Sequence, residues 1–186
     1  MSKNLRDYTK TIYTLDSVVH QLQDGDWDKQ SPNDEWNARE TLGHVIWGMR
    51  RIAAAINNEP EPAEQAEAEV AGSDPVGSWD EAREYILAAL DSHGALQKVI
   101  PTPFGEMPVD DAIGSLFLDP LTHAWDIAKA AGLDAYFPDD LAAKALQILQ
   151  AVGDAIRGPG IMEQAVEVSD DSSMIERLVA HTGRTP

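Results

Sequence analysis

The sequence predicts an all-α protein, built as an up-down bundle of four principal helices with an additional C-terminal helix packed alongside. Three observations predict this class. Apolar residues recur every three or four positions in several long runs, Pro- and Gly-containing segments separate those runs, and no segment alternates with the period of a strand for more than a few residues. The 186 residues are enough for one domain with a sizeable core, and we expect a single domain over residues 1–186.

The first two helices are expected from apolar runs on either side of a polar break. The first run extends from Leu5 to Leu22 and ends at "QDGDWDKQSPND". The second extends from Ala38 to Ile56 and is entered through the turn formers of "SPNDEW". Residues 58–78 are acidic and rich in Pro and Ala, and we expect them to form a mobile loop.

The third expected helix runs from Trp79 to about Ile100 and carries His93 on its apolar stripe. The segment "PTPFGEMP" follows, and because its three prolines cannot continue a helix, it predicts an irregular or hairpin-like link. The fourth helix is expected from about Val109 to Ala131, with Gly132 as a left-handed cap.

The fifth expected helix starts after Pro138, has an apolar stripe from Leu141 to Ile156, and ends at "GPG". The tail segment "SMIERLVAHTG" is long enough for one last short helix.

The charge and composition exclude several kinds of partner. A formal charge of -18 would repel nucleic acid and anionic membranes, so neither is an expected partner. The chain has no apolar run of membrane-spanning length, and "MSKNLRDYTK" lacks the apolar core of a signal peptide, which favours a cytoplasmic location. With no cysteine there is no disulfide, no thiolate zinc site and no protein thiol nucleophile. Any thiol chemistry must therefore use a borrowed thiol.

A line of polar residues lies beside the apolar face of the fourth expected helix. It contains Asp119, His123 and Asp126, with small residues at both ends. The i, i+4 spacing of Asp119 and His123 stacks the two side chains, so that they can share a divalent ion. His44 lies on a comparable flank of the second helix and would complete three ligands if the two helices face each other.

Other interpretations of the same residues stay open at this point. An Asp/His pair at i, i+4 is commonly a solvated ion pair. His93, on the midline of its helix, fits a core histidine but could replace His44 as a ligand. His20 and His181 resemble ordinary surface residues. Tryptophans at helical positions more often pack in the core or at its rim than serve as platforms for a substrate, and we expect this of Trp36, Trp47, Trp79 and Trp125.

Four segments carry a family resemblance that covers nearly the whole chain. "LTHAWDIAKAAG", preceded by an acidic residue four positions before its histidine, resembles the metal-binding helix of the mycothiol-dependent maleylpyruvate isomerase N-terminal family, a branch of the DinB-like helical bundles. "SPNDEWNARETLGHVIWG" resembles the second-helix motif of that family. "TPFGEMP" and "IERLVAHTGRTP" resemble its short, single-domain, metal-binding branch.

The resemblance implies a ligand set of His44, Asp119 and His123. The family often has Glu or His at the position of Asp119, and the shorter Asp would hold the metal closer to its own helix. We expect His44 to bind a zinc ion, or nickel as the alternative, at about 2.0–2.2 Å. We expect His93 to lie in the core, away from the ion.

The resemblance also implies a function. Two histidines and one carboxylate leave open positions on a metal, as in catalytic sites. The family favours a mycothiol-dependent transferase or isomerase acting on a small electrophile, with the thiol cofactor and that substrate as partners and a homodimer formed through helix faces. The isomerase that names the family has an additional C-terminal domain. A metal- or small-ligand-binding protein without turnover and a metal-dependent hydrolase are the alternatives. Asp126 is either an orienting carboxylate for His123 or a surface charge.

Overall fold

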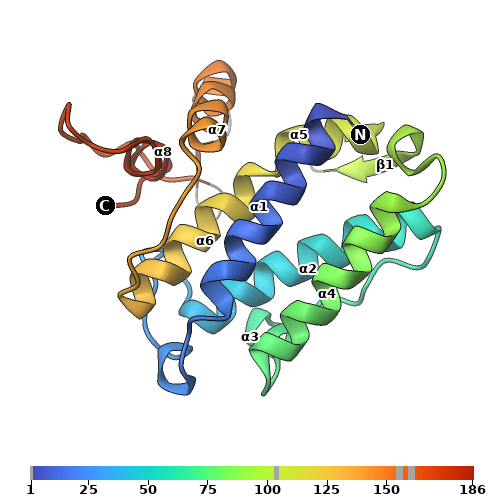
Figure 1. The fold of residues 1–186 in the computed structure, drawn as a ribbon, viewed down its shortest axis with the longest axis horizontal. Coiled ribbons are helices and arrows are strands. Elements are labelled where there is room, and N and C mark those ends of the chain that lie inside the picture. Colours follow the sequence, from blue (N-terminus) through green and yellow to red (C-terminus); the bar gives the residue numbers. More distant parts are fainter. Residues whose placement is uncertain (1, 103–104, 154–156, 159–161) are drawn as a thin grey trace.

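The structure, a computed structural model, describes residues 2–102, 105–153, 157–158 and 162–186 (Figure 1). Helices dominate, and two short strands form a hairpin. The elements in chain order are α1 (Lys3–Val19), α2 (Ala38–Asn57), α3 (Glu67–Ala71), α4 (Pro75–Asp91), β1 (Val99–Thr102), β2 (Gly105–Pro108), α5 (Val109–Leu116), α6 (Leu118–Ala131), α7 (Asp139–Val152) and α8 (Met174–His181).

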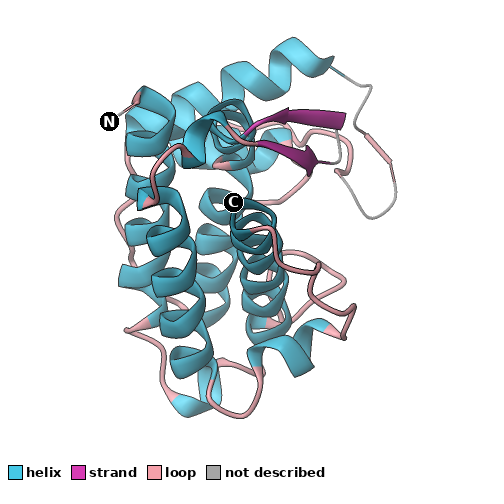
Figure 2. Cartoon of the chain, turned by 90° about the vertical axis from the view of Figure 1, so that its right-hand side faces the viewer, coloured by secondary structure: helices cyan, strands magenta, loops and turns pink. Residues whose placement is uncertain are grey.

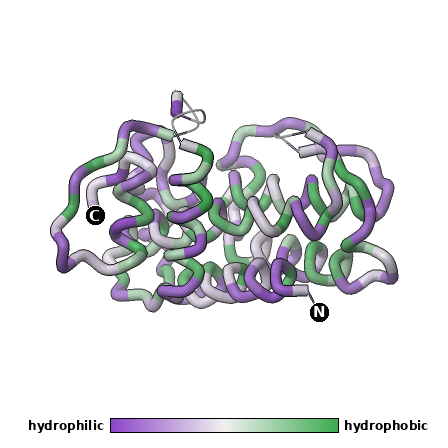
Figure 3. Tube along the Cα trace, turned by 90° about the horizontal axis from the view of Figure 1, so that it is seen from above, coloured by the Kyte–Doolittle hydropathy of each residue, from purple (hydrophilic) through white to green (hydrophobic). Residues whose placement is uncertain are grey.

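The bundle is formed by α1, α2, α4 and the pair α5/α6. α1 packs against α4, α5 and α6, and α2 packs against α4 and α6. Hydrophobic and hydrophilic residues alternate along these helices, as amphipathic packing requires (Figure 3). The centre of the bundle is filled by buried side chains from α1, α2, α4, α5 and the junction of α5 with α6, including Tyr8, Ile12, Leu15, Leu42, Ile46, Met49, Trp79, Ile86, Ile113 and Phe117. The expected all-α class is confirmed.

The only sheet among the described residues is the hairpin of β1 and β2, which lies beside the helices (Figure 2). Its strands are antiparallel, with Val99 opposite Pro108 and Thr102 opposite Gly105. The hairpin alternative for "PTPFGEMP" is therefore correct, although residues 103–104 lie outside the described residues.

The third helix is shorter than expected. α4 ends at Asp91, Ser92 is extended, and Gly94 adopts a left-handed φ of 74°. Because a left-handed residue cannot continue an α-helix, the chain turns there and enters β1. His93 is consequently exposed in this turn, and the expectation that it lies in the core was wrong.

The fourth helix is two helices. Pro120 has no N–H to donate to the carbonyl of Leu116, so the regular hydrogen bonding is interrupted and α5 gives way to α6 at Phe117. Phe117 keeps right-handed angles (φ -61°, ψ -23°), which makes the break a bend in a nearly continuous path. As a result Asp119 stands in the first turn of α6.

Residues 58–78 were expected to be a loop, and this was wrong for their second half. They contain α3 and the first turn of α4, and Pro75 is the first residue of α4. α3 packs directly on α2 at Gly43, where an added Cβ would come within 1.8 Å of the Glu67 carbonyl oxygen. The glycine before His44 is thus required by the close approach of two helices.

The C-terminal region adds α7 and α8, which pack against each other and against α6. The expected end of the fifth helix, residues 154–156, lies outside the described residues. No helix in the described part of the chain combines the length and the apolar character needed to cross a bilayer.

A candidate metal centre between α2 and α6

The first helix of the site, α2, has a firmly defined start. The Asn37 side chain accepts a hydrogen bond from the Glu40 N–H at 2.9 Å, and the Glu40 carboxylate accepts one from the Asn37 N–H at 2.9 Å. This reciprocal cap fixes the first turn of the helix. His44 follows one turn after Glu40, on the flank that faces α6.

The second helix, α6, supplies the other two residues of the predicted set. Asp119 and His123 are one turn apart, so their side chains stack along the helix surface. His123 is 8% exposed, whereas the side chains of His44 and Asp119 are 34% and 43% exposed. The cluster therefore lies at the rim of the bundle, closed on the His123 side and open on the others.

The two histidines converge on one carboxylate oxygen of Asp119. His44 Nε2 lies 3.6 Å and His123 Nε2 lies 3.4 Å from Oδ1 of Asp119. One candidate ligand atom from each residue lies within 4.8 Å of the others. Bonds of about 2.0–2.2 Å at a tetrahedral angle separate neighbouring ligand atoms by roughly 3.4 Å, so the spacing fits a single ion.

The charges of the cluster depend strongly on one another. Burial raises the pKa of Asp119, but the charges and hydrogen bonds of His123 and His44 outweigh this and hold the pKa well below its usual range. Burial lowers the pKa of His123, but Asp119 and Asp126 overcome it and raise the pKa to about 9. The metal-free site therefore carries a proton on His123 at neutral pH, and a metal ion must displace that proton.

A buried carboxylate stands behind His123. Asp126 is fully buried, and its Oδ2 accepts a hydrogen bond from Nδ1 of His123 at 2.9 Å. The imidazole proton is thereby held on Nδ1, which leaves Nε2 as the ligand atom once His123 is neutral. Of the two alternatives for Asp126, the structure supports the orienting carboxylate and excludes a surface charge.

Asp126 is in turn held by Arg184, from the tail after α8. The guanidinium donates to both carboxylate oxygens, from Nε at 2.7 Å and from Nη2 at 2.7 Å, and from Nη1 to Thr182 at 3.0 Å. Burial alone would raise the pKa of Asp126. The hydrogen bonds from His123 and Arg184 outweigh this effect and lower the pKa, so Asp126 stays charged. Sequence reasoning missed Arg184, because 58 residues separate it from Asp126 and no local pattern links them.

Two aromatic residues complete the surroundings. The ring centroid of Trp36 lies 4.6 Å from that of His44 and 5.9 Å from that of His123. Tyr8 on α1 is 2% exposed, and burial together with the charge of Asp119 raises the pKa of its phenol, which keeps its proton. Packing at the core or its rim was expected of Trp36 in preference to a role as a substrate platform, and its position against two candidate ligands was not anticipated.

A second cluster of the same residue types lies between α1 and α4. Asp16, His20 and Asp80 also bring one ligand atom each within 4.8 Å. However, the guanidinium of Arg83 contacts Asp16 and lies 3.0 Å from Asp80, so a cation already occupies the space between the carboxylates. His20 is 42% exposed, as a surface residue should be. This cluster forms a structural ion-pair network and is a poor metal site.

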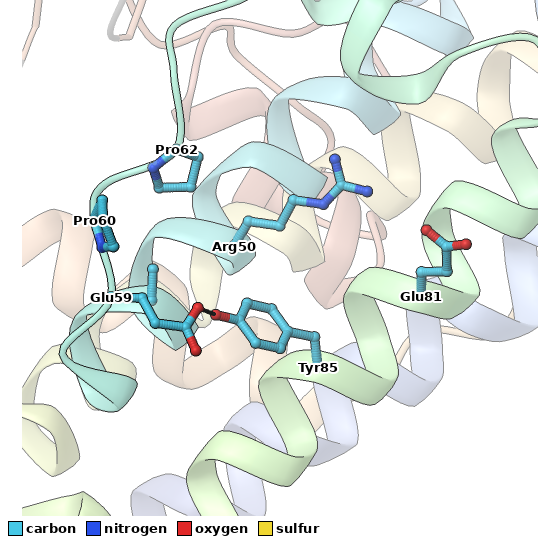
Figure 4. A pocket seen from close by; sticks show the side chains of 7 residues that line it. Arg50, Glu59, Pro60, Pro62, Glu81 and Tyr85 are labelled. Atoms are coloured by element: carbon cyan, nitrogen blue, oxygen red, sulfur yellow. Dashed lines mark hydrogen bonds between the residues drawn. The ribbon is translucent and has the colours of Figure 1, made fainter.

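The hollow in Figure 4 shares no residue with the candidate metal centre. It has a volume of about 320 Å³ and is lined by Arg50, Ala54, Glu59, Pro60, Pro62, Glu81 and Tyr85. The Tyr85 hydroxyl donates a hydrogen bond to Glu59 at 2.5 Å across its floor. Within this hollow Tyr85 and Glu59 are engaged with each other, whereas the two histidines and the carboxylate that converge lie between α2 and α6.

The fold and the cluster define a class, a helical bundle with two histidines and one carboxylate converging between two helices. The family model of the DinB superfamily matches residues 7–124, which include all three converging residues. The chain belongs to the DinB superfamily, whose members commonly bind a divalent metal ion.

Two relatives from Mycobacterium tuberculosis are similar to the chain. They are the uncharacterized proteins MT0763, from strain CDC 1551, and Rv0738, from strain H37Rv. Each is 30% identical over 131 residues, which covers 70% of this chain and 69% of the relative. No solved structure matches the chain significantly.

Proposed function

We propose that the protein binds a divalent metal ion, zinc or alternatively nickel, through His44, Asp119 and His123. The observation that carries this proposal is the approach of both Nε2 atoms to one carboxylate oxygen, at 3.6 and 3.4 Å. Two imidazoles and a carboxylate suit zinc, and three protein ligands leave room for a further one.

We further propose that this metal serves a thiol-dependent transferase or isomerase acting on a small electrophile. The bound ion would supply Lewis acidity that favours the deprotonated form of an incoming thiol. Because the chain has no cysteine, the thiol must come from a cofactor, and the resemblance described above favours mycothiol.

The residues of the chain have distinct parts in this proposal. Asp126 keeps the proton of His123 on Nδ1, and Arg184 keeps Asp126 charged and in place. Burial of His123 on one side of the cluster excludes water there, and the more exposed His44 and Asp119 leave an approach for the thiol. The proton of the thiol leaves to solvent or to the substrate, because both carboxylates near the ion are already engaged.

That last observation also favours the second candidate function, a metal-binding protein without turnover. Among the described residues, the carboxylates of Asp119 and Asp126 both have partners, so neither is a free general base. In a hydrolase the bound ion alone would have to lower the pKa of its water, because neither Asp119 nor Asp126 is free to accept the proton, and we rank this alternative third.

The test is a thiol-conjugation assay with metal-loaded protein, mycothiol and a generic electrophile such as a chlorodinitrobenzene. Metal-loaded protein should accelerate thiol consumption, and both metal-stripped protein and Asp119→Ala treated with the same metal should not. Stoichiometric metal with no acceleration across several electrophiles would contradict the enzyme and favour the non-catalytic function. Protein that takes up no metal would overturn both.

A further inference from the structure

Trp36 is placed so that it touches both candidate histidine ligands. Its indole is tilted by 30° to the His44 ring at a centroid distance of 4.6 Å, and by 56° to the His123 ring at 5.9 Å. The two imidazoles lie 5.2 Å apart, nearly edge to face. The two nitrogens that face Asp119 thus belong to rings that both border one indole, and Trp36 forms a wall of the site.

The backbone beneath Trp36 is held firmly. Its carbonyl accepts hydrogen bonds from the N–H of Ser31 at 3.2 Å, from Oγ of Ser31 at 2.8 Å and from Nε2 of Gln30 at 2.9 Å. Ser31 is buried, and the next residue, Asn37, caps α2. The backbone that carries the indole is thereby ordered before a ligand arrives, which lowers the entropic cost of binding.

The charge of the loaded site favours an anionic ligand. A divalent ion with two neutral imidazoles and the carboxylate of Asp119 leaves one positive charge. Asp126 does not offset it, because Arg184 already neutralises that carboxylate through two hydrogen bonds. A thiolate or a carboxylate bound to the ion would complete the balance.

We propose that Trp36 determines specificity at this site by contacting the body of the ligand, so that the site selects small anions attached to a flat, apolar or unsaturated group. This inference rests on the proposed metal site and adds the class of ligand to it. The indole borders both imidazoles, so a group attached to an anion bound there would lie beside it, and a planar group would make closer contact with that ring than a puckered one. Tyr8, at 2% exposure, offers far less surface to a ligand.

The test compares two carboxylates of similar size on zinc-loaded protein, benzoate and cyclohexanecarboxylate, by titration calorimetry. Stacking on an aromatic ring typically changes affinity by roughly 3- to 10-fold, and wild-type protein should prefer benzoate by that factor. Trp36→Leu should bind zinc as before and lose the preference, whereas Trp36→Phe should retain most of it. Trp47→Leu is the matched control, since Trp47 lies on α2 but packs against Arg51, and it should keep the preference.

Zinc content is measured first, so that two kinds of failure remain distinct. Wild-type protein without zinc would overturn the proposed metal site and this inference with it. Zinc-loaded wild-type protein that binds both carboxylates equally would overturn the inference alone. The same holds for Trp36→Leu that keeps the benzoate preference, and for Trp36→Leu and Trp36→Phe that fold but lose zinc, which would make the indole a support for the ligands.

Discussion

Two clusters in this molecule are built from aspartate and histidine, and they differ in where an arginine lies relative to the carboxylates. The one between α2 and α6 contains His44, Asp119 and His123, and the one between α1 and α4 contains Asp16, His20 and Asp80. In the first, Arg184 bonds the buried carboxylate of Asp126, which orients His123, and among the described residues it does not bond Asp119. In the second, Arg83 lies directly among the carboxylates.

Whether such a cluster can bind a metal ion depends more on where the arginine lies than on how many histidines and carboxylates are present. Arg184 neutralises Asp126 and leaves the carboxylate of Asp119 to the histidines, so those three groups stay available to an ion. Arg83 already supplies the positive charge that a metal would bring. One cluster is open to a metal and the other is complete without one.

Removal of His123 should have the largest effect. His123→Ala should abolish stoichiometric metal binding, because it removes one ligand and the contact with Asp126, while its core-facing neighbours on α6 still bury the helix. His20→Ala is the matched control from the other cluster and should keep full metal content. Elemental analysis after mild dialysis decides between them, with thermal unfolding to show that both variants fold. Stoichiometric metal in His123→Ala would mean that the ligand set is wrong.

The pH dependence should be the next largest effect. The pKa of His123 is about 9 in the metal-free fold, above its ordinary value of 6.5. Metal affinity should therefore rise by about tenfold per pH unit between those values, with release of one proton. Titration calorimetry in buffers of different ionisation enthalpy measures that proton.

The same shift gives the metal-free protein a stability change of the opposite sign. A raised histidine pKa contributes stability that is fully present below pH 6.5 and is lost as the pH rises through about 9. The Tm of the metal-free protein should fall across this window, and His123→Gln should remove most of that fall. A His123→Gln profile identical to wild type would contradict the assignment of the proton to His123.

Substitution of Arg184, which holds the orienting carboxylate of Asp126, should have a smaller effect on metal affinity. Arg184→Gln leaves Asp126 buried without its counter-charge and releases His123, and loss of such outer partners typically weakens metal binding by about 10- to 100-fold. Arg184→Lys should recover part of the affinity. Arg177→Gln is the control, because Arg177 hydrogen-bonds the backbone carbonyls of Ser172 and Asp170, away from the candidate metal centre, and its metal affinity should be unchanged.

The second cluster should give the smallest effect. Arg83→Gln removes the cation between Asp16 and Asp80, both partly exposed, and should lower the free energy of unfolding by about 1 kcal/mol or less. Its metal content should equal that of wild type. A second bound metal in Arg83→Gln under the same dialysis would show that the arginine suppresses a strong site, which the comparison does not predict.

The residues of the candidate site could be predicted from the sequence more accurately than the ends of the helices. The i, i+4 spacing of Asp119 and His123 is a local property of one helix, and the structure brings this pair close to His44. The apolar stripe of the third helix, in contrast, continued past Asp91 while Gly94 turned the chain. Periodicity alone therefore predicted His93 in the core. In the structure the left-handed Gly94 turns the chain, and His93 is exposed to solvent.

The parts that sequence reasoning missed depend on contacts between distant segments. Arg184 reaches Asp126 only because α8 packs near α6, and Trp36 reaches two helices from the loop before α2. The break at Phe117 could have been found, since Pro120 removes a helical hydrogen bond that the sequence reveals. α3 could not, because it depends on the contact of Glu67 with Gly43, two residues 24 positions apart in the chain (67 − 43).

The most direct test of the central claim is a crystal structure of the zinc-loaded protein with the ion located by its anomalous scattering. We expect one ion bonded to Nε2 of His44, Nε2 of His123 and a carboxylate oxygen of Asp119, at about 2.0–2.2 Å each. Nδ1 of His123 should keep its hydrogen bond to Asp126. An ion at Asp16, His20 and Asp80, or one bound by Asp119 with the two histidines turned away, would contradict it.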